Sequence, residues 1–157
     1  QQELQFLIDN NIKVKGEYQL TDALQNMKNK GLKLKASAID EWFDCGNKEA
    51  TLHTTKRILE LSSPDQLIMP DAKIINSVII PPCFIGINAI IENSIIGPHV
   101  SIGKHTHVRS SIIKESIIQR YSQVENLIIS NSIVGNNSEI NGSFKDLNVG
   151  DYNTLTL

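Results

Sequence analysis

The chain has 157 residues, enough for one ordinary domain or two small ones with a core that needs no disulfides. With 15 Lys and Arg against 17 Asp and Glu, the net charge is −2, which argues against a nucleic-acid partner. No apolar run approaches the roughly 18 residues of a membrane span and no signal segment is recognisable, so we expect a cytoplasmic protein without a membrane partner. Cys45 and Cys83 lack metal-type spacing and are predicted to be free thiols in a reducing compartment.

Three helices are predicted in the first sixty residues. Apolar residues at helical spacing predict one helix in residues 1–10 and another in residues 20–31. After a turn at residues 42–46, Asn47 is a good N-cap, and the apolar stripe that follows it predicts a third helix. The stripe consists of Leu52, Thr55, Ile58 and Leu59.

Between the second and third helices a strand is predicted at residues 32–38. Apolar Leu32, Leu34, Ala36 and Ala38 alternate there with polar residues, which is the period of a half-buried strand. This is the only convincing strand in residues 1–62, and the apolar surface is large for so short a segment. We therefore expect residues 1–62 to be the closing segment of an α/β domain whose sheet lies mostly upstream of Gln1.

From about residue 68 the sequence becomes a repeat. A polar pair followed by two aliphatic residues recurs at steps of 17 or 16 residues, as in Asn76-Ser77-Val78-Ile79, Asn93-Ser94-Ile95-Ile96, Ser110-Ser111-Ile112-Ile113, Glu115-Ser116-Ile117-Ile118 and Asn131-Ser132-Ile133-Val134. Such a period is typical of a solenoid. We therefore divide the chain into residues 1–62, a breaker-rich linker at 63–69 and a solenoid at 70–157.

Large aliphatic residues fall every five or six positions within this period, so that three steps make one triangular turn. The residues predicted to point inward are Ile80, Ile85, Ile91, Ile96, Ile102, Val108, Ile113, Ile118, Val124, Ile129, Val134 and Ile140. Glycine follows several of them, as in Ile85-Gly86 and Ile102-Gly103, where a side chain would crowd the next turn. The length predicts roughly four to five turns. Residues 143–157 lose the period and are predicted to cap the open end.

Two motifs and the repeat, taken in order, resemble a known enzyme family. The run Gly16-Glu17-Tyr18-Gln19-Leu20-Thr21-Asp22 precedes Trp42-Phe43-Asp44-Cys45-Gly46, and the repeat follows. This arrangement resembles the carboxyl-terminal part of a sugar-1-phosphate nucleotidyltransferase. The resemblance implies an α/β fragment, the end of a Rossmann-like nucleotidyltransferase domain, followed by a hexapeptide-repeat, left-handed parallel β-helix. The left-handed sense comes from the resemblance alone, because general chirality rules favour right-handed crossovers.

The resemblance also implies an activity. Enzymes of this family join a nucleoside triphosphate and a hexose 1-phosphate, here with dTTP and glucose 1-phosphate as first choice, to give an NDP-sugar and pyrophosphate. The glycine-rich phosphate-binding loop of the family has no counterpart in this sequence. We therefore expect the chain to be the carboxyl-terminal portion of such an enzyme, inactive by itself, with no complete catalytic set and with its substrate-binding residues unassigned.

Asp44 is the candidate metal ligand. Nucleotidyl transfer gathers negative phosphate oxygens, so the site needs a divalent cation, and Mg²⁺ prefers a few carboxylate ligands. In the resembling family the aspartate of Trp-x-Asp-x-Gly holds the metal with a second aspartate from the amino-terminal half, and Asp44 matches the first. Trp42 is expected to pack beneath the site. Glu17, Thr21 and Asp22 are expected to tie the start of a helix to neighbouring loops.

Two other classes of function stay open. Hexapeptide solenoids also occur in acyltransferases, which use a histidine as general base near acyl-coenzyme A, and in a carbonic anhydrase family that binds zinc through three histidines. His99 and His105 should lie on successive sides of the prism, whereas His105 and His107 can share one face. We therefore expect solvent-facing histidines instead of one cluster. The other class is a purely structural module for oligomerisation or regulation.

An assembly is predicted from the outward residues of the repeat. Aliphatic residues such as Ile87, Ile90 and Ile95 fall at outward positions with little charge around them. Exposed apolar faces of this kind commonly pack against a second copy. We expect a homo-oligomer formed through residues 70–157.

Overall fold

The computed structural model describes residues 1–64, 67–142 and 148–156. By their contacts the residues fall into two compact units, Gln1–Trp42 and Phe43–Leu157. The third helix therefore groups with the solenoid. The division into residues 1–62 and 70–157 was drawn from sequence composition and stays a prediction. No helix among the described residues is long and apolar enough to cross a lipid bilayer.

The first unit contains two helices, α1 (Gln2–Asp9) and α2 (Leu20–Asn29), as the helical spacing predicted. They contact each other directly. One apolar residue from each helix is almost fully buried, Leu7 at 3% exposure and Ala23 at 2%. Burial of so few side chains stabilises a helix pair only weakly.

The strand predicted at residues 32–38 does not form, and this prediction was wrong. The segment pairs with no other strand, and Leu32 and Leu34 are 49% and 51% exposed. A strand needs a neighbour for its backbone N–H and C=O groups, and alternation decides which face is buried only once that neighbour exists. The described residues of the first unit supply no such neighbour, so a Rossmann-like fragment is not confirmed.

The third helix, α3 (Lys48–Leu61), begins where the sequence predicted. The side-chain oxygen of its N-cap, Asn47, accepts a hydrogen bond from the backbone N–H of Ala50 at 2.8 Å. Glu49 lies in the first turn, where the positive end of the helix dipole favours a carboxylate. The start of α3 is therefore fixed by local chemistry alone.

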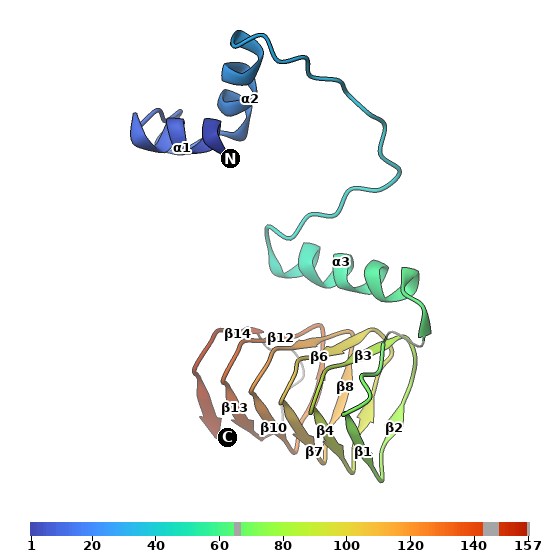
Figure 1. The fold of residues 1–157 in the computed structure, drawn as a ribbon. Helices are drawn as coiled ribbons and strands as arrows, with labels where there is room; N and C mark the ends of the chain where they lie inside the picture. The colour runs from blue at the N-terminus through green and yellow to red at the C-terminus, as the bar shows by residue number, and fades with distance from the viewer. Residues whose placement is uncertain (65–66, 143–147, 157) are drawn as a thin grey trace. The chain divides into compact units, whose positions relative to one another are not determined.

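A parallel β-solenoid follows α3 (Figure 1). Its strands are β1 Lys73–Ile75, β2 Val78–Ile79, β3 Cys83–Ile85, β4 Ile90–Glu92, β5 Ile95–Ile96, β6 Val100–Ile102, β7 His107–Arg109, β8 Ile112–Lys114, β9 Ile117–Ile118, β10 Gln123–Glu125, β11 Ile128–Ser130, β12 Ile133–Val134, β13 Glu139–Asn141, β14 Asn148–Val149 and β15 Thr154–Thr156. Within the described residues they form three sheets, ordered β1-β4-β7-β10-β13-β15, β2-β5-β8-β11 and β3-β6-β9-β12-β14. Each of the first four turns contributes one strand to each sheet, which confirms the triangular turn. The left-handed sense stays a prediction.

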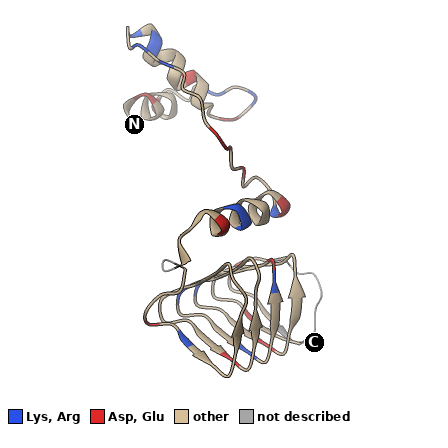
Figure 2. Ribbon diagram, turned by 90° about the vertical axis from the view of Figure 1, so that its right-hand side faces the viewer, with Lys and Arg blue, Asp and Glu red and all other residues tan. Residues whose placement is uncertain are grey.

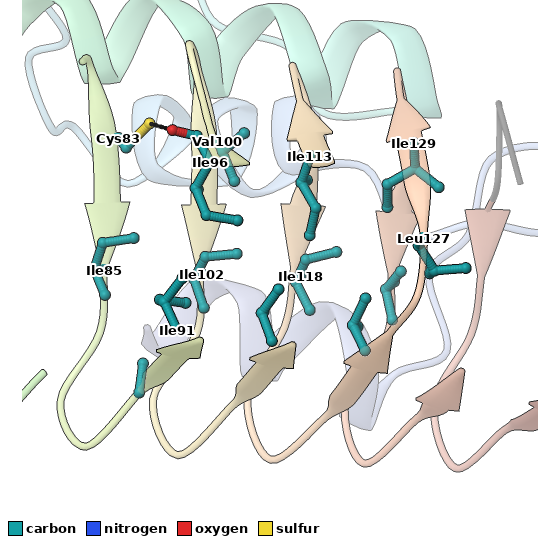
Figure 3. Packing of buried hydrophobic residues seen from close by; sticks show 14 of the residues in the cluster. Cys83, Ile85, Ile91, Ile96, Val100, Ile102, Ile113, Ile118, Leu127 and Ile129 are labelled. Atoms are coloured by element: carbon teal, nitrogen blue, oxygen red, sulfur yellow. Dashed lines mark hydrogen bonds between the residues drawn. The ribbon is translucent and has the colours of Figure 1, made fainter. Parts of the chain in front are cut away.

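The predicted inward residues form the core of the solenoid (Figure 3). At most 2% of the surface is exposed for Ile85, Ile91, Ile96, Ile102, Val108, Ile113, Ile118, Val124, Ile129, Val134 and Ile140. Ile80 is the exception, with 41% exposed, because the strand register pairs Ile79 with the buried Ile96 and leaves Ile80 beyond the end of β2. Each buried aliphatic side chain contributes roughly 1.5–3 kcal/mol.

Buried hydroxyl groups bond the backbone at the corners of the prism. Ser111 is an example, since its Oγ donates to the carbonyl oxygen of Arg109 at 2.8 Å and accepts from the backbone N–H of Leu127 at 3.1 Å. The residue before each such position has a positive φ, as at Asn93 (+47°) and Glu115 (+46°). Asparagine tolerates this left-handed region well, which explains the repeated Asn-Ser pairs.

Glycine after the inward residue is a steric requirement, as predicted. A Cβ added to Gly103 would lie 2.5 Å from the backbone nitrogen of Arg120 on the next turn. At Gly86 the corresponding distance, to the backbone nitrogen of Lys104, is 2.7 Å. Any larger residue would push two turns of the solenoid apart.

The two cysteines are free thiols, as predicted. Cys45 is exposed in the turn before α3, and Cys83 is buried in the core. Burial raises the pKa of the Cys83 thiol above its ordinary value, although a hydrogen bond from the backbone of Val100 works in the opposite direction. Cys83 therefore behaves as a small apolar core residue.

The end of the solenoid differs from the predicted cap. β14 pairs with β12, and β15 pairs with β13, in the same parallel arrangement as the preceding turns. The chain thus continues the ladder, with β14 in the fifth turn and β15 at the start of a sixth, where the sequence period is already lost. Residues 143–147 and 157, which the predicted cap also included, lie outside the described residues.

Candidate functional site

Asp44 lies in a short turn that the first half of α3 holds in place. Its side-chain Oδ1 accepts a hydrogen bond from the backbone N–H of Gly46 at 3.0 Å. Thr54 Oγ1 donates to the backbone carbonyl of Asp44 at 2.7 Å, and Thr51 Oγ1 donates to that of Cys45 at 3.3 Å. The backbone of the turn is therefore pinned to α3, while the Asp44 side chain remains exposed to solvent.

The Asp44 carboxylate suits one ligand position of a magnesium site. Mg²⁺ is usually held by one or two carboxylates together with water and substrate phosphates. The described residues contain no group of three or more His, Cys, Asp or Glu side chains that could hold a metal ion. A Cβ added to Gly46 would lie 3.3 Å from Asp44 Oδ1, so glycine leaves this carboxylate its room. Asp44 can therefore offer a single carboxylate to a metal ion, and no such group surrounds it among the described residues.

The matched residues of the first unit occupy the start of α2. The backbone N–H of Asp22 bonds to the carbonyl of Gln19 at 3.1 Å, but no side-chain hydrogen bond caps the helix. Asp22 Oδ2 is buried and has no hydrogen-bond partner among the described residues. Trp42 is 80% exposed, so its expected packing role is not seen in this chain. Glu17, Thr21 and Asp22 instead line a shared hollow of about 530 Å³.

Helix α3 lies over one corner of the solenoid. Three residues, each 16 positions after the last, form this corner on successive turns. These corner residues are His99, Glu115 and Asn131, all with positive φ, and we refer to them as the corner column. His99 Nε2 lies 3.1 Å from Glu60 Oε1, near the carboxyl end of α3. The amino-terminal half of α3 and the other two corner residues enclose a hollow of about 340 Å³.

Glu60 is the acceptor that joins this corner to α3. Arg57 Nη1 donates to Glu60 Oε2 at 2.7 Å, while His99 meets the other carboxylate oxygen. The hydrogen bond from Arg57 lowers the pKa of Glu60 below its ordinary value against the opposing effect of burial, and the charges of Arg57, His99 and Lys56 add to the lowering. Glu60 is therefore ionised at neutral pH and available to His99.

The histidines of the solenoid are placed differently from one another. The prediction that all of them face solvent was wrong for His99, whose side chain is only 15% exposed and whose Nδ1 is buried without a hydrogen-bond partner. The reason is that α3 covers its corner. His105 is exposed and stacks on Tyr121 with 5.1 Å between ring centroids. His107 Nε2 lies 3.0 Å from Glu92 Oε2.

A shallow groove runs along the sheet that contains β3, β6 and β9, and the sequence did not predict it. Its volume is about 570 Å³. Phe84 and Ile117 supply apolar surface, and the only charged residues among those that line it are Lys104 and Arg120. Two basic residues one turn apart, Lys104 and Arg120, are the sequence signal that could have found it.

Comparison with known families supports the repeat. Residues 57–124, less than half of the chain, match the family model described as GlmU-like, C-terminal hexapeptide. A search of curated proteins found no match. The match and the solenoid together identify a hexapeptide-repeat β-helix. The matched family suggests acetyl- or nucleotidyltransferases as the class, and it assigns neither substrate nor activity to this chain.

Proposed function

We propose that these residues belong to a magnesium-dependent sugar-1-phosphate nucleotidyltransferase. The reaction would join a nucleoside triphosphate and a hexose 1-phosphate, with dTTP and glucose 1-phosphate as the preferred pair, to an NDP-sugar and pyrophosphate. The nucleotide-binding segments would lie outside these 157 residues, because the sequence contains no glycine-rich phosphate loop. The chain alone is expected to be inactive.

The Asp44 turn is the observation that supports this proposal most. Its carboxylate is exposed, whereas its backbone is pinned through Thr54 and Thr51 to the helix that leads into the solenoid. A pinned backbone that presents an exposed carboxylate suits a metal ligand, because ligands act best when they are held before the substrate arrives. The order of the turn, α3 and the hexapeptide repeat is also that of the resembling family.

Asp44 would hold the magnesium ion in this reaction. The bound ion would neutralise phosphate charge and stabilise the pyrophosphate leaving group. The sugar phosphate oxygen would attack the α-phosphorus in line, so no covalent enzyme intermediate is needed. The part of this chain is to orient the carboxylate, whose Oδ1 accepts a hydrogen bond from the backbone N–H of Gly46.

Replacement of Asp44 by Asn tests the proposal in the protein that contains both this chain and the nucleotide-binding segments. The change keeps the size of the side chain and removes its charge, so turnover should fall on the order of 10²-fold or more. Pyrophosphate release from glucose 1-phosphate with each nucleoside triphosphate in turn measures the effect. The control is Asp71→Asn at the exposed start of the solenoid. A folded Asp44→Asn variant with near-normal turnover would remove Asp44 from the site.

The solenoid is proposed to form a homo-oligomer with further copies of the chain. One sheet presents an outward column of aliphatic residues in register, Val78, Ile95, Ile112 and Ile128, each between 39% and 58% exposed. Charged residues are more widely spaced along the solenoid than along α3 (Figure 2). Sedimentation should show an oligomer at tens of micromolar, and a clean monomer would count against it. No nucleic acid or membrane is proposed as a partner.

The groove beside Lys104 and Arg120 favours acyl transfer as a second candidate. Its two cations and apolar lining suit an anionic ligand with an apolar part, such as acyl-coenzyme A, and His105 lies next to Lys104 in the chain. Isothermal titration with acetyl-coenzyme A separates the candidates. Binding that Lys104→Ala abolishes would favour acyl transfer, and absence of binding to the assembled protein would exclude it.

A further inference from the structure

The Asp44 turn has its contacts on α3, so the position of its carboxylate depends on the position of that helix. Thr54 and Thr51 hold the turn through backbone carbonyl groups, and Asn47 caps the helix immediately after the turn. These bonds join the turn to the first two turns of α3. Anything that fixes α3 on the solenoid therefore also fixes Asp44 relative to the solenoid.

The spacing of α3 matches that of the corner column beneath it. An α-helix rises about 5.4 Å per turn, and successive solenoid turns are about 4.8 Å apart. Residues three or four apart on α3 can therefore face successive corner residues. Glu60 pairs with His99, and Lys56 and His53, one and two helical turns earlier, line the hollow together with Glu115.

The two ends of α3 are held unequally. At the carboxyl end, Glu60 is bonded to both Arg57 and His99, and Leu59 beside it is 4% exposed. Toward the amino end, the hollow of about 340 Å³ separates the helix from the last two corner residues. The Asp44 turn is therefore connected through α3 to the contact between Glu60 and His99.

We propose that His99 is a positioning residue that, by bonding Glu60, seats α3 on the corner column and so fixes the Asp44 turn. The role in catalysis rests on the proposed nucleotidyl transfer, whereas the seating of α3 does not. The contact with Glu60 explains why the side chain of His99 is largely covered, whereas that of His105 is exposed. In the tautomer that donates from Nε2 to Glu60, the unpartnered Nδ1 is an acceptor and carries no buried N–H.

The seating of α3 can be measured in this chain without any enzyme assay. His99→Asn suits the test because asparagine tolerates a positive φ and already occupies the same corner at Asn131, but it is too short to reach Glu60. The matched control is His105→Asn, the same change at φ +55° on another corner. Amide exchange of α3 and of Gly46 should accelerate about 10-fold in His99→Asn and stay unchanged in the control.

A graded variant separates the bond from simple loss of packing. Glu60→Gln keeps an oxygen that can accept from His99 Nε2 but lacks the charge, so its exchange rates should fall between those of the native chain and His99→Asn. Equal exchange in the native chain and in folded His99→Asn would overturn the proposal. Unfolding of the whole solenoid would be visible as exchange in the core strands, and exchange confined to α3 and the turn is the expected result.

The catalytic part is tested in the protein that includes the nucleotide-binding segments. His99→Asn should raise the magnesium concentration for half-maximal activity about 10-fold and leave the KM for sugar phosphate unchanged. If His99→Asn accelerates exchange in α3 but leaves the magnesium requirement unchanged, the link from His99 to Asp44 is overturned. The proposed nucleotidyl transfer would not be affected by that result. Absence of nucleotidyl transfer in the native protein would overturn the proposed function and this link together, and the exchange result would still decide the seating of α3.

Discussion

Residues 32–38 have the alternation of apolar and polar side chains that is typical of a strand, yet they form none, whereas the solenoid strands form although several, such as Ile95–Ile96, carry aliphatic residues on both faces. Leu34 in the first segment is 51% exposed, whereas Ile113 in β8 is fully buried. The difference lies in the neighbours, because Ile113 pairs with Ile96 on one side and Ile129 on the other. Successive turns of a repeat supply partner strands for one another, whereas a single alternating segment must pair with a strand from another part of the protein.

The two units therefore depend on different sources of stability. The solenoid buries an aliphatic stack with no contribution from the first unit. In the first unit, only Leu7 of α1 and Ala23 of α2 are almost fully buried among the described residues, and most large apolar residues around them are exposed. We expect the first unit to need a partner sheet for its full structure and the solenoid to need none.

The largest expected effect is on the core of the solenoid. Ile113→Ala should lower the free energy of unfolding by roughly 2–5 kcal/mol, because it removes buried methyl groups and leaves a cavity between turns. Leu34→Ala, the corresponding change in the other unit, should alter it by about 0.5 kcal/mol or less. Urea unfolding followed by circular dichroism measures both. Equal losses in the two variants would break the comparison.

Ile112→Ala is the control for the same strand. Ile112 is adjacent to Ile113 but 42% exposed on the outward side of β8. Its truncation should leave the unfolding free energy of the single chain nearly unchanged.

A smaller effect is expected from crowding between turns. Gly103→Ala would place a Cβ 2.5 Å from the backbone nitrogen of Arg120, and the displaced backbone should cost about 1–3 kcal/mol. Gly150→Ala is the matched control, since the nearest atom to its added Cβ is Asn153 Nδ2 at 3.6 Å. Thermal melting of the two variants should separate them, and identical melting temperatures would show that the turns are not in close contact at Gly103.

The fold was predictable where the sequence repeats or where a local signal acts alone. The N-cap at Asn47 fixed the start of α3, and the repeat fixed nearly all inward residues. Ile80 was misplaced because counting by five or six from Ile85 ignores the strand register that selects Ile79. The strand at 32–38 failed because alternation carries no information about a partner.

The candidate site was predictable only in part. Asp44 stood out because a motif surrounds it, and its role as a metal ligand stays a prediction. His99 was expected to face solvent, because its repeat position does point outward and nothing in the period shows that α3 covers that corner. Contacts between a repeat and a flanking helix depend on the path of the linker, which local patterns do not encode.

Amide exchange of the native chain, resolved by residue, tests the central contrast most directly. Backbone N–H groups of β4 to β12 should exchange slower than those of residues 32–38 by a factor on the order of 10³ or more, because only the former are bonded between solenoid turns. Apart from Leu32, whose N–H bonds to the carbonyl oxygen of Met27 at 3.1 Å, residues 32–38 should exchange like an unstructured peptide. Comparable protection in both segments would contradict the account, since it would show that the alternating segment finds a partner within this chain.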